Sequence, residues 1–200
     1  MTEKHRHLTP LLIARSQLLT AIDLFFADGD PISVHALAGA AREILEELCR
    51  LECIEPMTDF ILRDHPNKSR KDIWNAMNLY RNCFKHLGKT LEEREEDQAI
   101  ISQFEETANE YLLYVCVEDY VRLRGKSPIE FQILQAWFVG LHLDLLVDSS
   151  KTELFRRAFP ELEQKSRVEQ KRCGRDMIAL KMNDQKLLVD PRTEPRDIHH

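Results

Sequence analysis

Apolar residues recur every three to four positions along most of the chain, which is the spacing of one buried face on an α-helix. The first such stretch covers residues 9–27 and the second covers residues 31–53. Between them, the Asp28-Gly29-Asp30-Pro31 sequence predicts a sharp turn, with Gly29 in a left-handed conformation and Asp30 capping the second helix. A connection this short favours an antiparallel pair of helices.

The same spacing predicts further helices downstream. A short helix is expected over residues 57–63, and a longer one begins after a capping Ser69 and ends near Gly88. A Glu-rich linker then leads to the longest helix, over residues 95–123. Finally, Ser127-Pro128-Ile129-Glu130 has the composition of a capping box with proline at the first helical position, and it predicts a helix that ends near residue 146.

No stretch alternates apolar and polar residues for long enough to predict a strand, so the fold class is all-α. We expect an antiparallel helical bundle of about five core helices over residues 8–148. Residues 149–200 are densely charged and predict peripheral helices followed by a loose tail, with a small apolar anchor around Phe159 and Leu162.

Composition changes this picture little, but it narrows the class of protein. The chain has 200 residues and a net charge of -6, which gives no global argument for a nucleic-acid or anionic-membrane binder. The N-terminus lacks the apolar region of a signal peptide, and no run approaches the roughly 20 apolar residues of a membrane span. We therefore expect a cytoplasmic protein without a membrane partner. Its five scattered cysteines are expected to be structural thiols.

Several kinds of chemistry lack their sequence motifs. None of the eight histidines follows a Glu by three residues, so the Glu-x-x-His pairs of di-metal bundles are missing. The glycine-rich phosphate loops and the Gly-x-Ser-x-Gly nucleophile elbow are missing too. Glu46 and Glu47 are interpreted as part of the wet face of their helix, and His35 as a partly buried histidine bonded to a neighbour. We predict no metal site and no cofactor.

One segment departs from the acidic average. Residues 63–89 hold seven Lys and Arg against two Asp, an excess of five positive charges in a protein whose net charge is -6. Such an excess is typical of a phosphate-binding surface. The acidic residues 92–97 could also neutralise it within the fold.

Within this segment, Arg81, Asn82, Lys85 and His86 are crowded into six residues of an expected helix. Asn82 and His86 share a helix face because they are four residues apart, as do Arg81 and Lys85. Arg81 and His86 are five apart, so spacing alone does not bring them into one site. The residues permit a basic, His-containing cleft, and they equally permit a solvated helix face.

The Arg81-Asn82-Cys83-Phe84-Lys85-His86 sequence resembles the Arg-x(4–6)-His motif of HEPN domains, which are all-α bundles of four or five helices. The chain also resembles a group of uncharacterised bacterial proteins that have the Asp-Gly-Asp-Pro turn and an Asn-x-Phe-Lys-His segment, here residues 82–86. Many HEPN domains are metal-independent endoribonucleases that act as dimers, and others only bind nucleotides or partners. The resemblance implies that Arg81 and His86 are catalytic and that Asn82 and Lys85 support them at the phosphate.

The favoured hypothesis is thus a HEPN-like, RNA- or nucleotide-binding homodimer, with metal-independent ribonuclease activity of the toxin or defence type as its stronger form. An antitoxin-like protein is then a further candidate partner. The rival hypothesis is a non-enzymatic interaction module that dimerises through an apolar helix face. That face would contain Leu134, Trp137, Phe138 and Leu141.

Overall fold

The computed structural model describes residues 8–86, 88–145 and 149–194, and these are mostly helical. The all-α prediction is confirmed at this level, with one short pair of parallel strands in addition. In chain order the elements are α1 (Pro10–Phe26), α2 (Pro31–Leu51), α3 (Met57–Asp64), α4 (Arg70–Lys85), α5 (Leu91–Ile101), α6 (Thr107–Arg124), β1 (Ser127–Pro128), α7 (Ile129–Leu141), α8 (Thr152–Ala158), α9 (Arg167–Lys181), α10 (Gln185–Leu188) and β2 (Thr193–Glu194).

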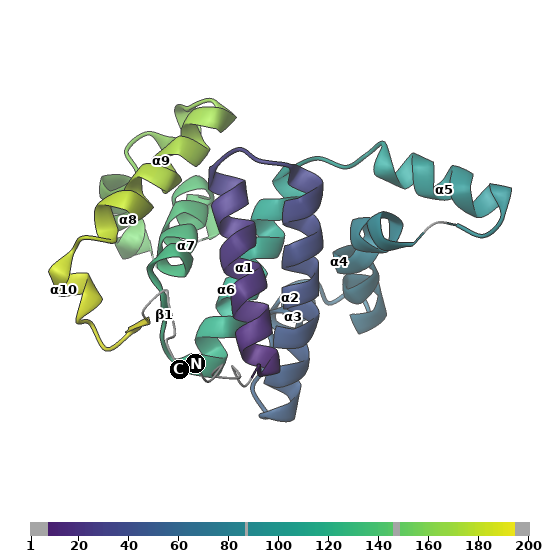
Figure 1. The fold of residues 1–200 in the computed structure, drawn as a ribbon, viewed down its shortest axis with the longest axis horizontal. Coiled ribbons are helices and arrows are strands. Elements are labelled where there is room, and N and C mark those ends of the chain that lie inside the picture. Colours follow the sequence, from purple (N-terminus) through teal and green to yellow (C-terminus); the bar gives the residue numbers. More distant parts are fainter. Residues whose placement is uncertain (1–7, 87, 146–148, 195–200) are drawn as a thin grey trace, which may run out of the picture.

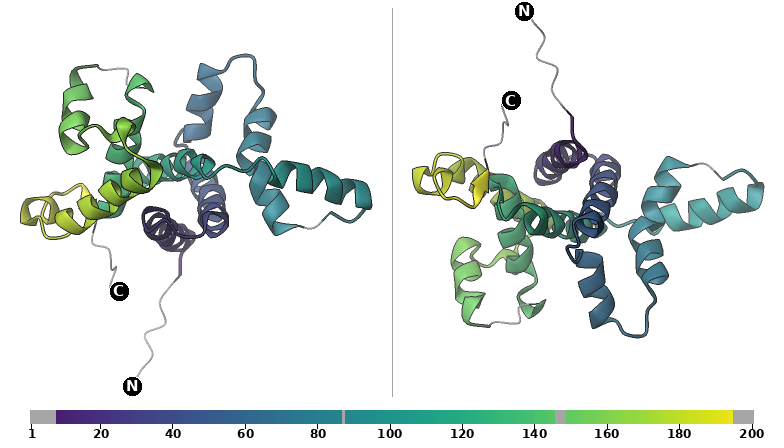
Figure 2. Two further views of the ribbon diagram at one scale, coloured as in Figure 1. Left: turned by 90° about the horizontal axis from the view of Figure 1, so that it is seen from above. Right: turned by 90° about the horizontal axis from the view of Figure 1, so that it is seen from below.

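The helices extend to two sides of a central group (Figure 1). The central group consists of α1, α2, α6 and α7. Seen from above and below, α4 and α5 project at one end of the molecule, whereas α8 to α10 lie at the other end (Figure 2). No helix in the described parts of the chain is both long and apolar enough to cross a membrane.

The turn between α1 and α2 shows how local side chains set the helix ends. The Asp30 carboxylate accepts a hydrogen bond from the Ser33 N–H at 2.9 Å and caps α2, as predicted. The left-handed residue is Asp28, with φ of 56°, and not Gly29 as the sequence suggests. Gly29 serves a close approach instead, because a Cβ at this position would lie 3.1 Å from the Leu24 carbonyl oxygen.

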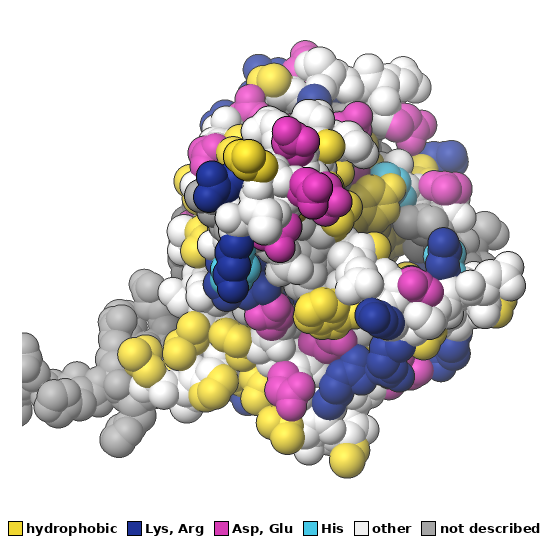
Figure 3. Space-filling model, turned by 90° about the vertical axis from the view of Figure 1, so that its right-hand side faces the viewer, with side chains coloured by type: hydrophobic (Ala, Val, Ile, Leu, Met, Phe, Trp, Pro, Cys, Tyr) yellow, Lys and Arg dark blue, Asp and Glu magenta, His cyan; other side chains and the backbone are white. Residues whose placement is uncertain are grey.

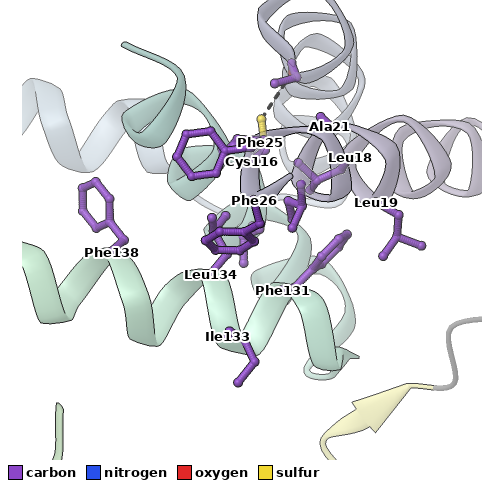
Figure 4. Close-up of a cluster of buried hydrophobic side chains, with 14 of the residues drawn as sticks. Leu18, Leu19, Ala21, Phe25, Phe26, Cys116, Phe131, Ile133, Leu134 and Phe138 are labelled. Atoms are coloured by element: carbon purple, nitrogen blue, oxygen red, sulfur yellow. Dashed lines mark hydrogen bonds between the residues drawn. The ribbon is translucent and has the colours of Figure 1, made fainter. Parts of the chain in front are cut away.

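The core is formed by one face of each central helix (Figure 4). Trp137 of α7 is completely buried and contacts the rings of Phe25 and Phe26 edge-on, each at 5.4 Å between ring centroids. The Cys116 thiol donates to the Ala38 carbonyl oxygen at 3.4 Å, which joins α6 to α2 within this core.

The apolar face of α7 is part of this core. Leu134, Trp137 and Phe138 are buried within the chain, and Leu141 is partly buried. These side chains are therefore not free to form the dimerisation face that the rival hypothesis assigned to them.

The predicted helix over residues 95–123 is wrong in one respect, because the chain forms two helices there. The Glu-rich segment predicted as a linker is the start of α5, which Thr90 and Glu93 cap reciprocally. The helix breaks between Ile101 and Thr107, where Phe104 packs its ring against His35 and the ring of Phe84. A tertiary contact that the periodicity does not indicate therefore lies in the break after α5.

The predicted capping box at Ser127 is also wrong. Ser127 and Pro128 form β1, which pairs in parallel with Thr193 and Glu194 of β2, and α7 begins only at Ile129 without a side-chain cap. The Ser127 N–H donates to the Arg192 carbonyl oxygen at 2.9 Å. Because Arg192 is more than sixty residues away in the chain, sequence rules for helix starts cannot predict this hydrogen bond.

The charged C-terminal segment is predicted to be peripheral, yet it contributes to the core. Phe159 and Leu162 are buried, as is Lys171 of α9. The Lys171 ammonium group lies 2.7 Å from the Asp28 carboxylate and also pairs with Glu106, so α9 is tied to the turn after α1 and to the residue before α6. The predicted boundary at residue 148 and the final residues of the predicted tail lie outside the described residues.

Candidate functional site

Arg81 of α4 is directed toward α2. Its methylene groups cross Gly39, where a Cβ would lie only 2.7 Å from the Arg81 Cδ, and its guanidinium pairs with both carboxylate oxygens of Glu43. One of these bonds, Nη2 to Oε2, is 2.6 Å long. A bidentate pair of this kind holds the guanidinium in the geometry that it would otherwise offer to a phosphate.

The other predicted site residues take no part in this pair. Asn82, Lys85 and His86 are all exposed. The His86 N–H donates to the Asn82 carbonyl oxygen at 2.9 Å and closes the last turn of α4, after which the chain is extended. In the described residues no hydrogen bond or ion pair links Arg81 to His86, and the His86 ring bonds to no other side chain.

The charge of Arg81 acts on a different histidine, His35. His35 of α2 is buried, as its sequence pattern predicts, and its Nδ1 lies 2.8 Å from the Asn109 Oδ1. Burial lowers the pKa of His35, the Asn109 hydrogen bond partly opposes this, and the Arg81 charge lowers it further. The ring is surrounded edge-on by Tyr80, Phe84 and Phe104. This cluster attaches α4 and the chain before α6 to α2.

Beneath Arg81, a buried polar network joins α2 to α4. Arg42 is completely buried, pairs with Glu46 and donates to the Asn78 Oδ1 at 2.9 Å. Asn78 in turn donates to the Trp74 carbonyl oxygen at 2.8 Å. Glu46 is therefore buried and fully bonded, and its interpretation as part of a wet helix face is wrong. The signal that could have revealed it is the Arg42–Glu46 spacing of four residues on a helix.

An open groove of about 650 Å³ lies between the two helices. Its walls come from both helices. From α2 come Glu43, Glu46, Glu47 and Arg50, and from α4 come Arg70, Lys71 and Trp74. The Trp74 side chain stands out here, because 47% of the residue is exposed to solvent.

The basic segment divides by residue type. Its three arginines are all paired with carboxylates on neighbouring elements: Arg63 with Glu55, Arg70 with Asp59, and Arg81 with Glu43. Its four lysines are all exposed, and within the described residues none of them has a hydrogen bond or ion pair through its side chain. They are Lys68, Lys71, Lys85 and Lys89.

The acidic residues of α5 do not neutralise these lysines. Glu93 caps its own helix, and Asp97 accepts from the Gly88 N–H at 3.0 Å. Glu92, Glu95 and Glu96 are exposed and pair with no side chain in the described ranges. Figure 3 shows this side of the molecule, where Lys and Arg side chains lie among Asp and Glu side chains.

The described residues contain no group of three or more His, Cys, Asp or Glu side chains that could hold a metal ion, and all five cysteines are free thiols. Comparisons of the chain with protein-family models, with curated proteins and with solved structures found no match. The function is therefore argued from the geometry around α4.

Proposed function

We propose that this protein binds RNA or nucleotides through the exposed edge of α4, as a HEPN-like antiparallel bundle of about five core helices in the cytoplasm. The observation that carries the proposal is the set of four exposed lysines without partners along α4 and its flanking turns. Lysines that pair with phosphates release the counterions condensed on the nucleic acid, which favours binding. The paired arginines of the same segment hold α4 and its flanking turn against neighbouring elements, and the lysines provide the positive charge for the phosphates.

Salt dependence of binding tests this proposal. We expect a labelled single-stranded RNA to bind more weakly as salt rises, with a slope set by the number of phosphates contacted. Replacing Lys71, Lys85 and Lys89 by alanine should flatten the slope of log K against log salt by about 2, since each contact to a single strand contributes about 0.7. Fluorescence anisotropy across a salt series measures this slope.

A matched control removes three exposed cations elsewhere. Arg156, Arg172 and Lys186 are exposed on or beside α8 to α10, far from α4 in the fold. Their triple alanine variant carries the same net charge as the α4 variant and should keep the wild-type slope. Equal slopes for all three proteins would contradict the proposal.

Ribonuclease activity is the stronger form of the same proposal. An RNA 2′-hydroxyl would attack its neighbouring phosphate, forming a 2′,3′-cyclic phosphate and releasing a 5′-hydroxyl, with His86 transferring the proton. Arg81 would stabilise the charge on the phosphate oxygens, while Asn82 and Lys85 support it. Because Glu43 occupies the Arg81 guanidinium, cleavage requires this pair to open.

The pair therefore predicts an unusual direction for one substitution. Glu43→Gln should raise cleavage of an RNA panel in EDTA above wild type, since it releases Arg81, and adding His86→Ala should abolish it. Glu52→Gln, which changes an exposed carboxylate without a side-chain partner in the described residues, serves as the control. If Glu43→Gln leaves no cyclic-phosphate ends, the catalytic role of Arg81 and His86 is wrong and binding alone remains.

A second candidate function, a homodimerisation module, is favoured by the projecting α4–α5 hairpin (Figure 2). The hairpin carries unpaired lysines on α4 and unpaired glutamates on α5, and no residue of α5 is buried. Two copies related by a two-fold axis could place α5 of one against α4 of the other. Such an interface would be self-complementary in charge.

Charge swapping tests this candidate. Replacing Glu92, Glu95 and Glu96 by lysine, or Lys71, Lys85 and Lys89 by glutamate, should each give a monomer in light scattering. In an equimolar mixture of the two variants, both contact sets of the mixed dimer set lysines against glutamates, so the dimer should return. A wild-type mass of 23.5 kDa at every protein and salt concentration would contradict it.

A further inference from the structure

The half-exposed Trp74 lies in the groove between α2 and α4, where it is an unusual surface residue. An indole of this size is costly to leave in water, and it usually finds a hydrogen-bond acceptor when it is buried. Here 47% of the residue is exposed, and no acceptor for its N–H is found in the described residues. Its backbone, by contrast, is held firmly, because its carbonyl oxygen accepts from the buried Asn78.

The charges of the groove are mostly satisfied internally. Glu43 is bonded by Arg81, and Arg70 pairs with Asp59 at 2.6 Å. Glu46 is bonded by Arg42, and its other oxygen lies 2.6 Å from the Arg50 Nη2. These pairs join four arginines to three carboxylates, so these charges of the groove are bonded to one another.

Two charged side chains of the groove remain without a bond in the part of the chain that the structure describes. They are the Lys71 ammonium group on α4 and the Glu47 carboxylate on α2, and both are exposed. The groove thus offers a ligand one aromatic face, one cation and one anion. A ligand that uses all three must combine a flat ring, an anionic group and a pair of N–H donors.

We propose that this groove binds a guanine nucleotide, either free or as one residue of a single-stranded RNA. The base would stack on Trp74, the phosphate would pair with Lys71, and the two oxygens of Glu47 would accept hydrogen bonds from the guanine N1–H and N2–H groups. The inference rests on the proposed function and names its ligand class. Base–aromatic stacking contributes to single-strand binding with any base, so Glu47 is the source of the preference.

Guanine is chosen over the other bases by its donor pattern. Its Watson–Crick edge presents two adjacent N–H donors, which match a carboxylate with two acceptor oxygens. Adenine presents an N–H donor beside a ring nitrogen acceptor, and uracil presents its single ring N–H between two carbonyl oxygens. Either arrangement sets an acceptor against one of the Glu47 oxygens. The volume of about 650 Å³ falls in the range of nucleotide-sized sites.

Intrinsic fluorescence offers a direct test, since the chain has two tryptophans and Trp137 is completely buried. We expect GMP to quench the emission of Trp74 in the wild-type protein, and AMP to bind at least about fivefold more weakly, as a bidentate contact to a base edge implies. Lys71→Ala should weaken both nucleotides. Glu47→Gln should weaken GMP and remove the preference over AMP.

Trp74→Leu provides the matched control, because it removes the reporter and the stacking surface while Trp137 remains to report folding. Three outcomes would each overturn the inference. They are residual quenching by GMP in this variant, equal quenching of wild type by GMP and AMP, and an unchanged preference in Glu47→Gln. If RNA still binds with a lysine-dependent salt slope in that case, the proposed function stands and only the guanine site fails. If the slope is also unaffected by the lysines, both fail.

Discussion

At the scale of single residues, one buried carboxyl group has a raised pKa. Asp119 of α6 is completely buried, and its Oδ1 accepts a hydrogen bond from the Met57 N–H at 2.6 Å. Burial raises the pKa of this carboxyl from 3.8 to about 6, the hydrogen bond from Met57 opposes the rise, and the nearby Glu46 charge adds to it. A carboxyl in this position is more easily protonated in the folded protein than in the unfolded chain.

Asp119 therefore predicts a loss of stability with rising pH. The stabilising contribution is complete below the unfolded pKa of 3.8 and is lost as pH rises through about 6. The difference corresponds to about 3 kcal/mol. Asp119→Asn keeps an acceptor for the Met57 N–H but cannot ionise. We therefore expect the unfolding free energy of this variant, relative to wild type, to rise by about this amount from pH 4 to pH 7.5. Urea denaturation at both pH values measures the difference.

The exposed Asp176 supplies the control, since its side chain is 69% exposed. Asp176→Asn should follow the wild-type pH dependence. If Asp119→Asn follows it as well, the carboxyl is not protonated preferentially in the folded protein.

At the scale of elements, contacts at small residues decide where helices pack. The α9 helix approaches α1 at Gly174, where a Cβ would lie 2.2 Å from the Phe26 Cε1. The Phe26 ring cannot move away easily, because it is itself packed against Phe25 and Trp137. Gly140 of α7 differs, since a Cβ there would meet nothing closer than 3.6 Å.

The two glycines therefore predict opposite effects of the same substitution. Gly174→Ala should lower the unfolding free energy by roughly 1–3 kcal/mol through overpacking, in spite of the better helix propensity of alanine. Gly140→Ala should be neutral or raise it by up to about 1 kcal/mol, because the helix propensity acts without a clash. Chemical denaturation of both variants measures this, and equal effects would show that α9 does not pack on Phe26 as described.

The α4–α5 hairpin is attached to α2 through the ring cluster around His35, so its attachment should depend on pH. The pKa of His35 is lowered by burial, so its neutral form favours the folded state above the unfolded pKa of 6.5, and this stability is lost as pH falls through the lower folded value. Of the groups facing the ring, Asn109 is uncharged and Arg81 opposes protonation. Protonation should loosen the hairpin before it loosens the core.

Hydrogen exchange compared at pH 7.5 and pH 5.5, corrected for intrinsic rates, measures this loosening. We expect protection of α4 to fall at the lower pH while that of α1 is unchanged. His35→Phe, which cannot be protonated, should remove the difference between the two pH values. A uniform loss of protection across all helices would argue against a local role for His35.

At the scale of the whole molecule, the two ends of the described chain are joined through one buried carboxylate. The Glu194 side chain accepts from the Tyr120 hydroxyl at 2.6 Å, and it pairs with Arg15 at 3.5 Å and with Arg124 at 3.3 Å. These partners come from α1 and α6. The segment predicted as a loose tail therefore includes a tertiary anchor, up to the last residue that the structure describes.

Glu194→Gln should consequently destabilise the whole fold. The substitution takes the carboxylate away from the buried Arg15, and breaking a buried ion pair costs about 3 kcal/mol. The thermal midpoint should fall and the transition should remain single, because α1, α6 and β2 lose the same interaction. Glu153→Gln breaks an exposed pair with Arg157 and should change little. A Glu194→Gln protein as stable as wild type would mean that β2 is not anchored here.

Features that depend on neighbours within one helical turn could be predicted from the sequence alone. Most of the helices follow from apolar spacing, and the caps by Asp30 and Ser69 follow from side chains that bond three residues ahead. The same local rules place Arg81, Asn82, Lys85 and His86 at the end of one helix.

Tertiary structure decided everything that depends on a distant partner. The Arg81 guanidinium could have faced a phosphate, but Glu43, thirty-eight residues away, pairs with it. Phe104, in the break after α5, packs on His35, and β1 forms by pairing with the distant β2. Helical periodicity predicts which residues share a face, but it does not predict which surface covers that face. The pairing of charges around α4 could therefore be learned only from the folded chain.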